Sequence, residues 1–136
     1  MSDFVLDASA TLAFVFPDER DANAVALARS LRTRRACAPT IWQWEVENAI
    51  VTAERAGRLT SERATALLED LAALPIELRE SRHGYLASAR RFKLSVYDAL
   101  YLELAQRLQL PLVSRDRALR HAARQLGLQA VTGFLA

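Results

Sequence analysis

Short apolar runs alternate with longer amphipathic stretches along this chain. Each run is short enough for a buried strand, and apolar residues recur with helical spacing in the stretches between the runs. Strands joined through helices pair in parallel, with helices packed on both faces of the sheet. We therefore expect an α/β fold with a parallel sheet, and strands over residues 4–6, 36–38, 76–78, 112–114 and 130–131.

The helices are predicted from one-sided apolar patterns and from the residues that begin or end them. The clearest covers residues 41–55, where Trp42, Val46 and Ile50 recur with helical spacing and Gly57 follows as a stop. Further helices are expected over residues 21–34, 60–75, 82–92, 98–110 and 117–126, with another beginning near residue 10.

The composition suits one compact folded unit. The chain has 136 residues, 51% of them hydrophobic, and no repeat or linker divides it, so a single domain over residues 1–136 is expected. The apolar run over residues 4–16 contains Asp7 and is too short to span a membrane. The one cysteine, Cys37, cannot form an internal disulfide and is expected to be buried, which fits a reducing cytoplasm.

Two aspartates directly follow predicted strands. Asp7 comes after the first strand and Asp116 after the fourth, and in parallel sheets ligands bind beyond the carboxyl ends of the strands. Each aspartate alone could instead cap the helix that follows it. An aspartate after a fully apolar run is costly to bury unless it binds a cation or several hydrogen-bond donors, which favours a functional site.

Two further acids lie on predicted helices. Glu45 borders the apolar stripe of its helix and can reach a cleft, whereas Glu47 lies further toward the polar side and is expected to be solvated. Asn48, three residues after Glu45, could help to orient it. Asp98 is expected to open its helix and to point inward. The alternatives are a purely structural cap for Asp98 and a rim position without function for Glu45.

Four carboxylates that meet at one sheet edge would repel one another unless divalent cations neutralised them. Oxygen ligands select Mg²⁺ or Mn²⁺, and such ions can activate water and stabilise the oxygens of a phosphodiester. The net charge is +2, but without these four acids 12 acidic residues face 18 basic ones, a balance of +6 that suits a polyanion. All the basic residues except Lys93 are arginine, which suits phosphate binding or reflects genomic base composition.

Four segments together resemble the PIN-domain nucleases, and among them the VapC-type toxins of bacterial toxin–antitoxin pairs. The segments are residues 5–10 (VLDASA), 45–49 (EVENA), 97–101 (YDALY) and 112–116 (LVSRD). The resemblance implies a three-layer α/β/α sandwich and an Mg²⁺-dependent endoribonuclease with RNA as substrate, usually a homodimer that a small antitoxin inhibits. The metal-binding and catalytic residues that it implies are Asp7, Glu45, Asp98 and Asp116, supported by Ser9 and by Ser114, which stands where the family often has threonine.

Other functions stay open at this point. Arg115 and His121 have the spacing of the HEPN ribonucleases, which would work without metal, although that family is helical. Asp7 could be the nucleophile of a haloacid-dehalogenase-type phosphatase, but Ser9 stands where a second aspartate would act as acid and base. A catalytically silent module that binds RNA or a protein partner on the same fold is a third alternative. Chelation by EDTA would stop a metal nuclease and spare a HEPN enzyme.

Two surface features are open to more than one interpretation. Trp44 lies off the apolar stripe of its helix and could form an interface or pack beneath a neighbouring helix. Several basic residues could guide RNA or could form solvated helix faces, and these are Arg79, Arg82, Arg90, Arg91 and Lys93.

Overall fold

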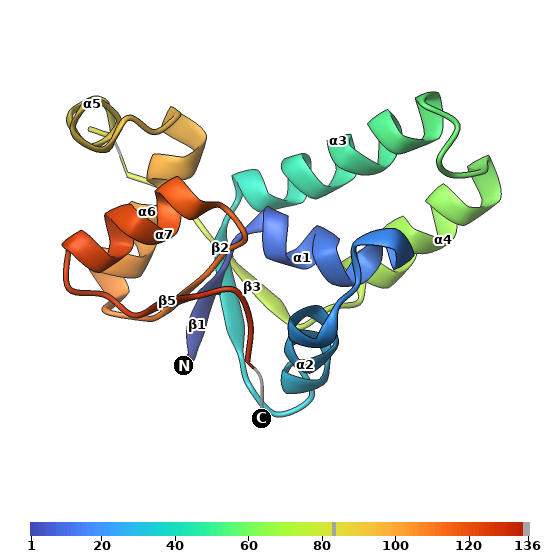
Figure 1. Ribbon diagram of the computed structural model, residues 1–136, viewed down its shortest axis with the longest axis horizontal. Coiled ribbons are helices and arrows are strands. Elements are labelled where there is room, and N and C mark those ends of the chain that lie inside the picture. The colour runs from blue at the N-terminus through green and yellow to red at the C-terminus, as the bar shows by residue number, and fades with distance from the viewer. Residues whose placement is uncertain (83, 135–136) are drawn as a thin grey trace.

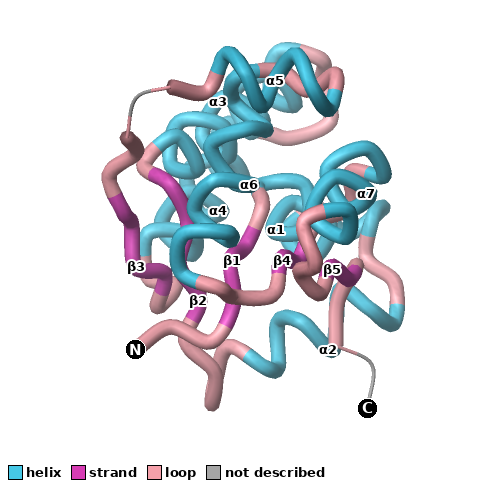
Figure 2. Tube along the Cα trace, turned by 90° about the vertical axis from the view of Figure 1, so that its left-hand side faces the viewer, coloured by secondary structure: helices cyan, strands magenta, loops and turns pink. Residues whose placement is uncertain are grey.

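A five-stranded parallel sheet forms the centre of the computed structural model, which describes residues 1–82 and 84–134. The strands lie side by side in the order β3-β2-β1-β4-β5 (Figure 2). Their bounds are β1 Phe4–Leu6, β2 Ala36–Pro39, β3 Ile76–Arg79, β4 Leu112–Val113 and β5 Ala130–Val131. The predicted parallel sheet is therefore confirmed.

Helices cover both faces of this sheet. One face carries α1 (Ala8–Val15), α2 (Ala22–Ser30), α3 (Ile41–Arg55) and α4 (Ser61–Ala72), and the other carries α5 (Leu86–Phe92), α6 (Val96–Leu108) and α7 (Arg117–Gln125) (Figure 1). A short 3₁₀ turn, Pro17–Glu19, which the pattern did not predict, follows α1. The predicted three-layer α/β/α sandwich is confirmed, and α3 and α4 extend beyond the sheet as an antiparallel pair (Figure 1).

The order of the strands reverses direction between β1 and β4. From β1 the chain moves outward through β2 to β3, then returns across the other face to β4, which lies on the opposite side of β1. Val5 pairs with Cys37 of β2 and with Leu112 of β4. Such a switch point opens a crevice at the carboxyl ends of the two central strands, where α/β proteins bind ligands.

The core is formed by the strands and by one stripe of each major helix. Trp42, Val46 and Ile50 of α3 are buried as predicted, and the Trp42 indole N–H donates to the Thr11 hydroxyl over 2.9 Å. Cys37 is completely buried, also as predicted. Trp44 is 59% exposed, so the alternative that it packs beneath a neighbouring helix is wrong.

Several predicted helix boundaries are wrong, and local capping explains two of them. α6 begins at Val96 because the Ser95 hydroxyl accepts the Asp98 backbone N–H, so Asp98 lies within the first turn instead of opening the helix. α5 begins at Leu86 rather than near residue 82, since Gly84 has a φ of 100° and interrupts a helical path. α2 ends at Ser30, four residues before the predicted end.

The described helices are also too short or too polar to cross a bilayer. Over residues 1–82 and 84–134, none combines the length and the hydropathy that a membrane span needs.

Candidate active site

Asp7 lies at the switch point, between the ends of the two central strands. Its backbone N–H donates to the Val113 carbonyl over 2.9 Å, which continues the β1–β4 ladder. The whole residue, backbone and side chain, is only 4% exposed. Although Asp7 precedes α1, its carboxylate makes no capping bond to that helix. The capping alternative for Asp7 is therefore wrong, and the buried carboxylate is directed to other partners.

Two serines hold the Asp7 carboxylate. The hydroxyls of Ser9 and Ser114 both donate to Asp7 Oδ2, over 2.6 and 2.7 Å. Burial raises the pKa of Asp7 from 3.8 to about 6; the two serine hydrogen bonds oppose this shift, and the charges of Glu45 and Asp98 add to it. Asp7 is thus an oriented carboxylate whose ionised form is costly without a cation.

The β4–α7 connection is joined to the same group. Ser9 Oγ accepts the Arg115 backbone N–H over 2.9 Å, and Ser114 Oγ accepts the Asp116 N–H over 3.0 Å. Asp116 Oδ1 accepts the Leu119 N–H over 2.9 Å, so its predicted capping alternative is confirmed. The cap uses one carboxylate oxygen of Asp116, and Ser114 connects the Asp116 backbone to the Asp7 carboxylate.

Glu45 approaches Asp7 from α3. The hydroxyl of Tyr101, on α6, donates to Glu45 Oε1 over 2.6 Å. Burial raises the pKa of Glu45, the Tyr101 bond opposes this, and the charge of Asp98 adds to it. Asn48 is exposed, and the residue that holds Glu45 Oε1 is Tyr101.

Tyr101 is the functional residue that sequence reasoning missed. Its helical spacing with apolar neighbours is typical of a core residue, and it is indeed completely buried. A buried tyrosine needs a partner for its hydroxyl, so its presence three residues after Asp98 on an inward face was an available signal. The partner itself, 56 residues away, could not be found from spacing alone.

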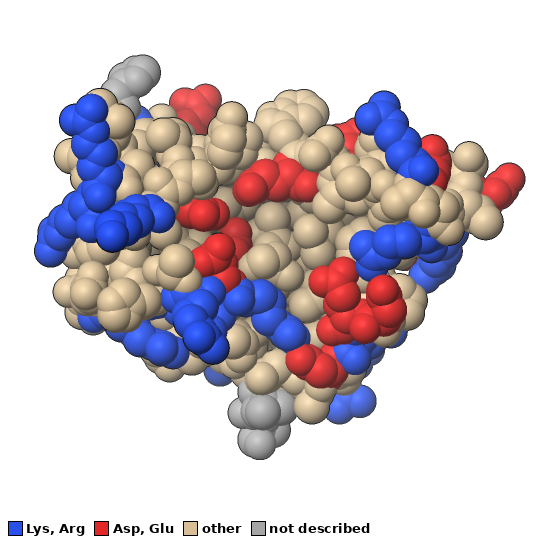
Figure 3. Space-filling view, turned by 45° about the horizontal axis from the view of Figure 1, so that its top comes forward, with Lys and Arg blue, Asp and Glu red and all other residues tan. Residues whose placement is uncertain are grey.

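Each of the four predicted acids interacts electrostatically with at least one of the others. Burial raises the pKa of Asp98, and the charge of Asp116 raises it further. Asp98 in turn acts on both Asp7 and Glu45, and Glu45 acts on Asp7. The structure therefore brings together Asp7, Glu45, Asp98 and Asp116, and Figure 3 shows acidic side chains gathered on a hollowed part of the surface with basic side chains beside them.

The donor chemistry of this group fits a hard divalent cation. All four side chains offer carboxylate oxygens, the ligands that Mg²⁺ and Mn²⁺ prefer, and three of them have a raised pKa that a cation would lower. Among the described residues, however, no three Asp, Glu, His or Cys side chains are close enough to form a preassembled metal site. Carboxylates repel one another, so an ion would be held only if these side chains lay closer together than they do here.

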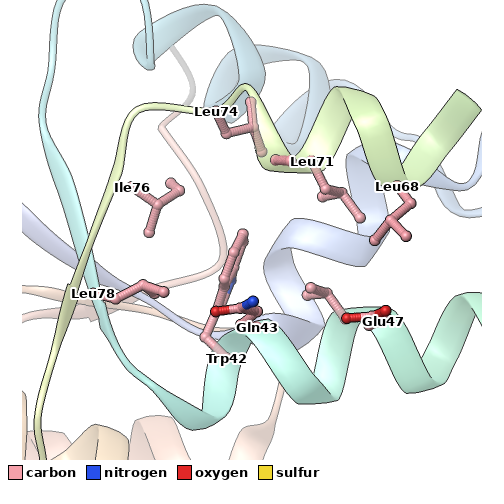
Figure 4. Close-up of a pocket in the computed structure, with 10 residues that line it drawn as sticks. Trp42, Gln43, Glu47, Leu68, Leu71, Leu74, Ile76 and Leu78 are labelled. Carbon is pink, nitrogen blue, oxygen red and sulfur yellow. The ribbon is translucent and has the colours of Figure 1, made fainter.

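Glu47 lies on the opposite flank of α3 from Glu45. It is half-buried rather than solvated, which corrects the prediction, because it lines an apolar groove formed by α3, α4 and β3. Figure 4 shows Trp42 at the floor of this groove, Leu68, Leu71 and Leu74 above it, and Ile76 and Leu78 along one side. The two glutamates therefore belong to different surfaces.

Comparison with known proteins identifies the family of this chain. Residues 4–125 match the PIN domain. The chain belongs to the PIN-domain family. It is 38% identical over 123 residues to Ribonuclease VapC3 of Mycobacterium tuberculosis, covering 87% of this chain and 85% of that protein. It is 33% identical over 123 residues to Ribonuclease VapC3 of Pyrobaculum aerophilum, covering 85% and 90%.

A solved structure supports the fold of this PIN domain. The crystal structure of PAE2754 from Pyrobaculum aerophilum superposes with a TM-score of 0.76 at 22% identity, covering 96% of this chain and 83% of that one. The predicted resemblance to VapC-type PIN domains is thus confirmed. The HEPN alternative is wrong, since that family is helical, and His121 is an exposed residue of α7.

Proposed function

We propose that this PIN-domain chain is a metal-dependent endoribonuclease and the toxin of a toxin–antitoxin pair. One observation carries the proposal: Glu45 and Asp98 lie close enough to the buried Asp7, at the switch point of the sheet, for their charges to raise its pKa, and Asp116 does the same to Asp98. Such a group has no evident structural use, because burying charge without a cation is unfavourable. The relatives named Ribonuclease VapC3 support RNA as the substrate.

We assign different roles to the four acids, the two serines and Tyr101. Asp7, Glu45, Asp98 and Asp116 would hold Mg²⁺ or Mn²⁺, which would supply an activated water and neutralise charge on the phosphate when bound. Ser9 and Ser114 aim the Asp7 carboxylate by donating to the same oxygen, Oδ2, and so leave Oδ1 available. Tyr101 holds Glu45 in place across the interior.

The raised pKa of Asp7 determines the pH range in which its carboxylate is ionised and could bind a cation. With a pKa of about 6, Asp7 is mainly ionised only above that pH, and binding of a cation releases the proton that remains below it. We therefore expect activity to rise between pH 5 and pH 7 and the apparent metal affinity to rise with it.

The proposed partners are a small antitoxin and a second copy of the chain. Large apolar side chains are exposed in the first turns of three helices, and these are Trp44 of α3, Leu86 of α5, and Val96 and Tyr97 of α6. Exposed aromatic and aliphatic groups of this kind are typical of interfaces. An antitoxin that places an arginine among the four acids would displace the cation by charge replacement.

A cleavage assay tests the proposed function. Purified protein incubated with total RNA should cut discrete transcripts in Mg²⁺ or Mn²⁺ and should lose that activity in EDTA. An Asp98→Asn variant keeps the side-chain shape but removes the ligand charge, so it should remain folded and inactive.

In cells, the wild-type protein should arrest bacterial growth, and the antitoxin should relieve the arrest. Undiminished cleavage in EDTA would refute the metal mechanism, and a soluble protein without any cleavage would indicate a silent binding module.

A further inference from the structure

A row of arginines follows the outer face of α7, beginning next to Asp116. Arg117, Arg120 and Arg124 lie at positions i, i+3 and i+7, so they share a stripe of about 60° on the helix. Leu119, Ala122 and Ala123 form the buried stripe on the opposite side. We call Arg117, Arg120 and Arg124 the α7 arginine row.

Two members of the row are held by backbone carbonyls. Arg120 Nη1 donates to the Ser114 carbonyl over 3.0 Å, and Arg124 Nη2 donates to the Ala130 carbonyl over 2.7 Å. Ser114 is also the residue whose hydroxyl holds Asp7. Arg120 is therefore connected to the acidic site through a single residue, and the guanidinium groups of Arg120 and Arg124 are positioned before any ligand arrives.

The row carries positive charge that the protein does not neutralise. Within residues 1–82 and 84–134, none of its three arginines forms an ion pair, whereas the neighbouring Arg115 pairs with Asp21 over 2.6 Å. Burial lowers the pKa of Arg120, and the charges of Arg124, Arg117 and Arg115 lower it further, while Asp116 opposes this. Three guanidinium groups are thus close enough to Arg120 to repel its charge, and a bound anion would relieve this repulsion.

We propose that the α7 arginine row is the binding surface for the RNA phosphate backbone, and that it leads the strand from β5 toward the acidic site. This inference rests on the proposed nuclease function and adds the path of the substrate to it. The row spans about 10 Å of helix axis, which suits a chain of phosphates better than a single anion. Arginine forks bind phosphate oxygens in pairs, and such contacts position a nucleic acid without reading its sequence.

The position of the row also answers an electrostatic problem. Four carboxylates repel a polyanion, so a substrate needs compensating charge close to them. Arg117 directly follows Asp116 in sequence, and Arg120 is close enough to Asp116 for their charges to interact. The row therefore offers attraction at the border of the region where the acids repel.

The test is RNA binding by the full-length protein in an inactive background. An Asp7→Asn variant would be titrated into a fluorescein-labelled, mixed-sequence single-stranded RNA in EDTA, at several KCl concentrations. The Arg117→Gln, Arg124→Gln double variant removes two charges from the row, and Arg55→Gln, Arg63→Gln is the matched control, because these exposed arginines lie on α3 and α4 away from the acids. Arg117→Gln alone is added because, within the described residues, its guanidinium makes no hydrogen bond that folding could require.

The expected result is a weaker and less salt-dependent complex. The double variant should raise the Kd for RNA about 10-fold near 0.1 M KCl and reduce the slope of log K against log[KCl] by about 1.4, since each single-strand phosphate contact contributes about 0.7. Arg117→Gln alone should raise the Kd about threefold, with half of that change in slope. The control pair should change the Kd by less than twofold.

A cleavage assay of the same substitutions, made in the chain that keeps Asp7, separates this inference from the proposed function. The row variants should raise KM and leave kcat within about twofold, because they remove uniform binding rather than a transition-state contact. A Kd and KM equal to those of the control pair, in a chain that still cuts RNA, would overturn the α7 proposal alone. A native chain that binds labelled RNA through the row but never cuts RNA would overturn the nuclease proposal and leave the row as a binding surface.

Discussion

The two flanks of α3 differ in what they bury and in what that burial costs. On one flank Glu45 meets Tyr101 and the charges of the acidic site, and burial raises the pKa of these carboxylates. On the other flank Glu47 borders a groove whose lining is mainly apolar, with Trp42, Val46 and Leu71 buried there. Apolar burial stabilises the fold, whereas buried charge destabilises it, so the two flanks divide stability and chemistry between them.

The largest expected effect distinguishes the two glutamates themselves. Glu45→Gln should lower kcat/KM for RNA cleavage about 10³-fold, because it removes a ligand charge that supports several kcal/mol of transition-state stabilisation. Glu47→Gln should change kcat/KM by less than twofold, since its side chain points about 200° away around the helix axis. Both variants would be assayed at saturating Mn²⁺ after a check of folding by circular dichroism. Equal losses would show that the groove flank takes part in the chemistry.

A truncation on the groove flank should reverse this pattern. Leu71→Ala removes a buried side chain of α4 and should lower the free energy of unfolding by about 3 kcal/mol, by lost transfer energy and a residual cavity. Urea unfolding measures the loss, and cleavage at a temperature where the variant remains folded should stay within about twofold of wild type. A large loss of kcat in the folded variant would mean that the groove supports the site.

Ionisation of Asp7, in the acidic site, should make the protein less stable as the pH rises. Asp7 has a pKa of about 6 in the folded chain against 3.8 ordinarily, so between these values the native state binds the proton more tightly than the unfolded chain. Stability should therefore fall as the pH rises through this window, by about 2–3 kcal/mol at most.

Asp7→Asn should reduce that pH dependence, and the raised pKa values of Glu45 and Asp98 should account for the rest. In EDTA the variant should be more stable than wild type at pH 7.5, and the difference should disappear near pH 4. Mn²⁺ should raise the Tm of wild type and leave that of the variant nearly unchanged, because only a native state that binds the ion gains from it. A wild-type stability that is flat from pH 4 to 7.5 in EDTA would contradict the buried, costly carboxylate.

The smallest expected effect concerns the residue that connects the site to the interior. Tyr101→Phe keeps the buried ring but removes the bond to Glu45, so the Mn²⁺ concentration for half-maximal activity should rise about 10-fold, as for other groups that orient metal ligands. Tyr97→Phe is the matched control, since that hydroxyl belongs to a side chain that is 58% exposed. Unchanged metal dependence in Tyr101→Phe would make the hydrogen bond purely structural.

Much of the fold follows from local pattern. The helix over residues 41–55 was predicted with the bounds that the structure shows, because its apolar stripe is regular and a glycine follows it. The positions of Asp7 and Asp116 beside each other follow from parallel topology, which brings strand ends together whatever their separation in sequence. The sequence therefore predicts that Asp7 and Asp116 lie at the same edge of the sheet.

The remaining features depend on contacts that local pattern does not contain. Ser95 caps α6 in place of Asp98, and both residue types cap well, so propensity alone could not choose between them. Glu47 is half-buried because α4 and β3 pack beside it, and a helical wheel of α3 alone does not include these neighbours. The Tyr101–Glu45 bond likewise requires α3 and α6 to lie on opposite faces of one sheet.

The central place of β1 determines when the site can exist during synthesis. Asp7 leaves the ribosome 107 residues before its second serine, Ser114, and the neighbouring Asp116 follows Ser114. β1 therefore lacks one of its two partner strands until β4 has emerged. Proteins generally fold from their N-terminal part first as they are made. Because the crevice needs two segments that are far apart in the sequence, a nascent chain holds no complete group of four acids before the β4–α7 segment has emerged. A ribosome that makes this protein is therefore not exposed to the proposed ribonuclease activity until the β4–α7 segment has been released.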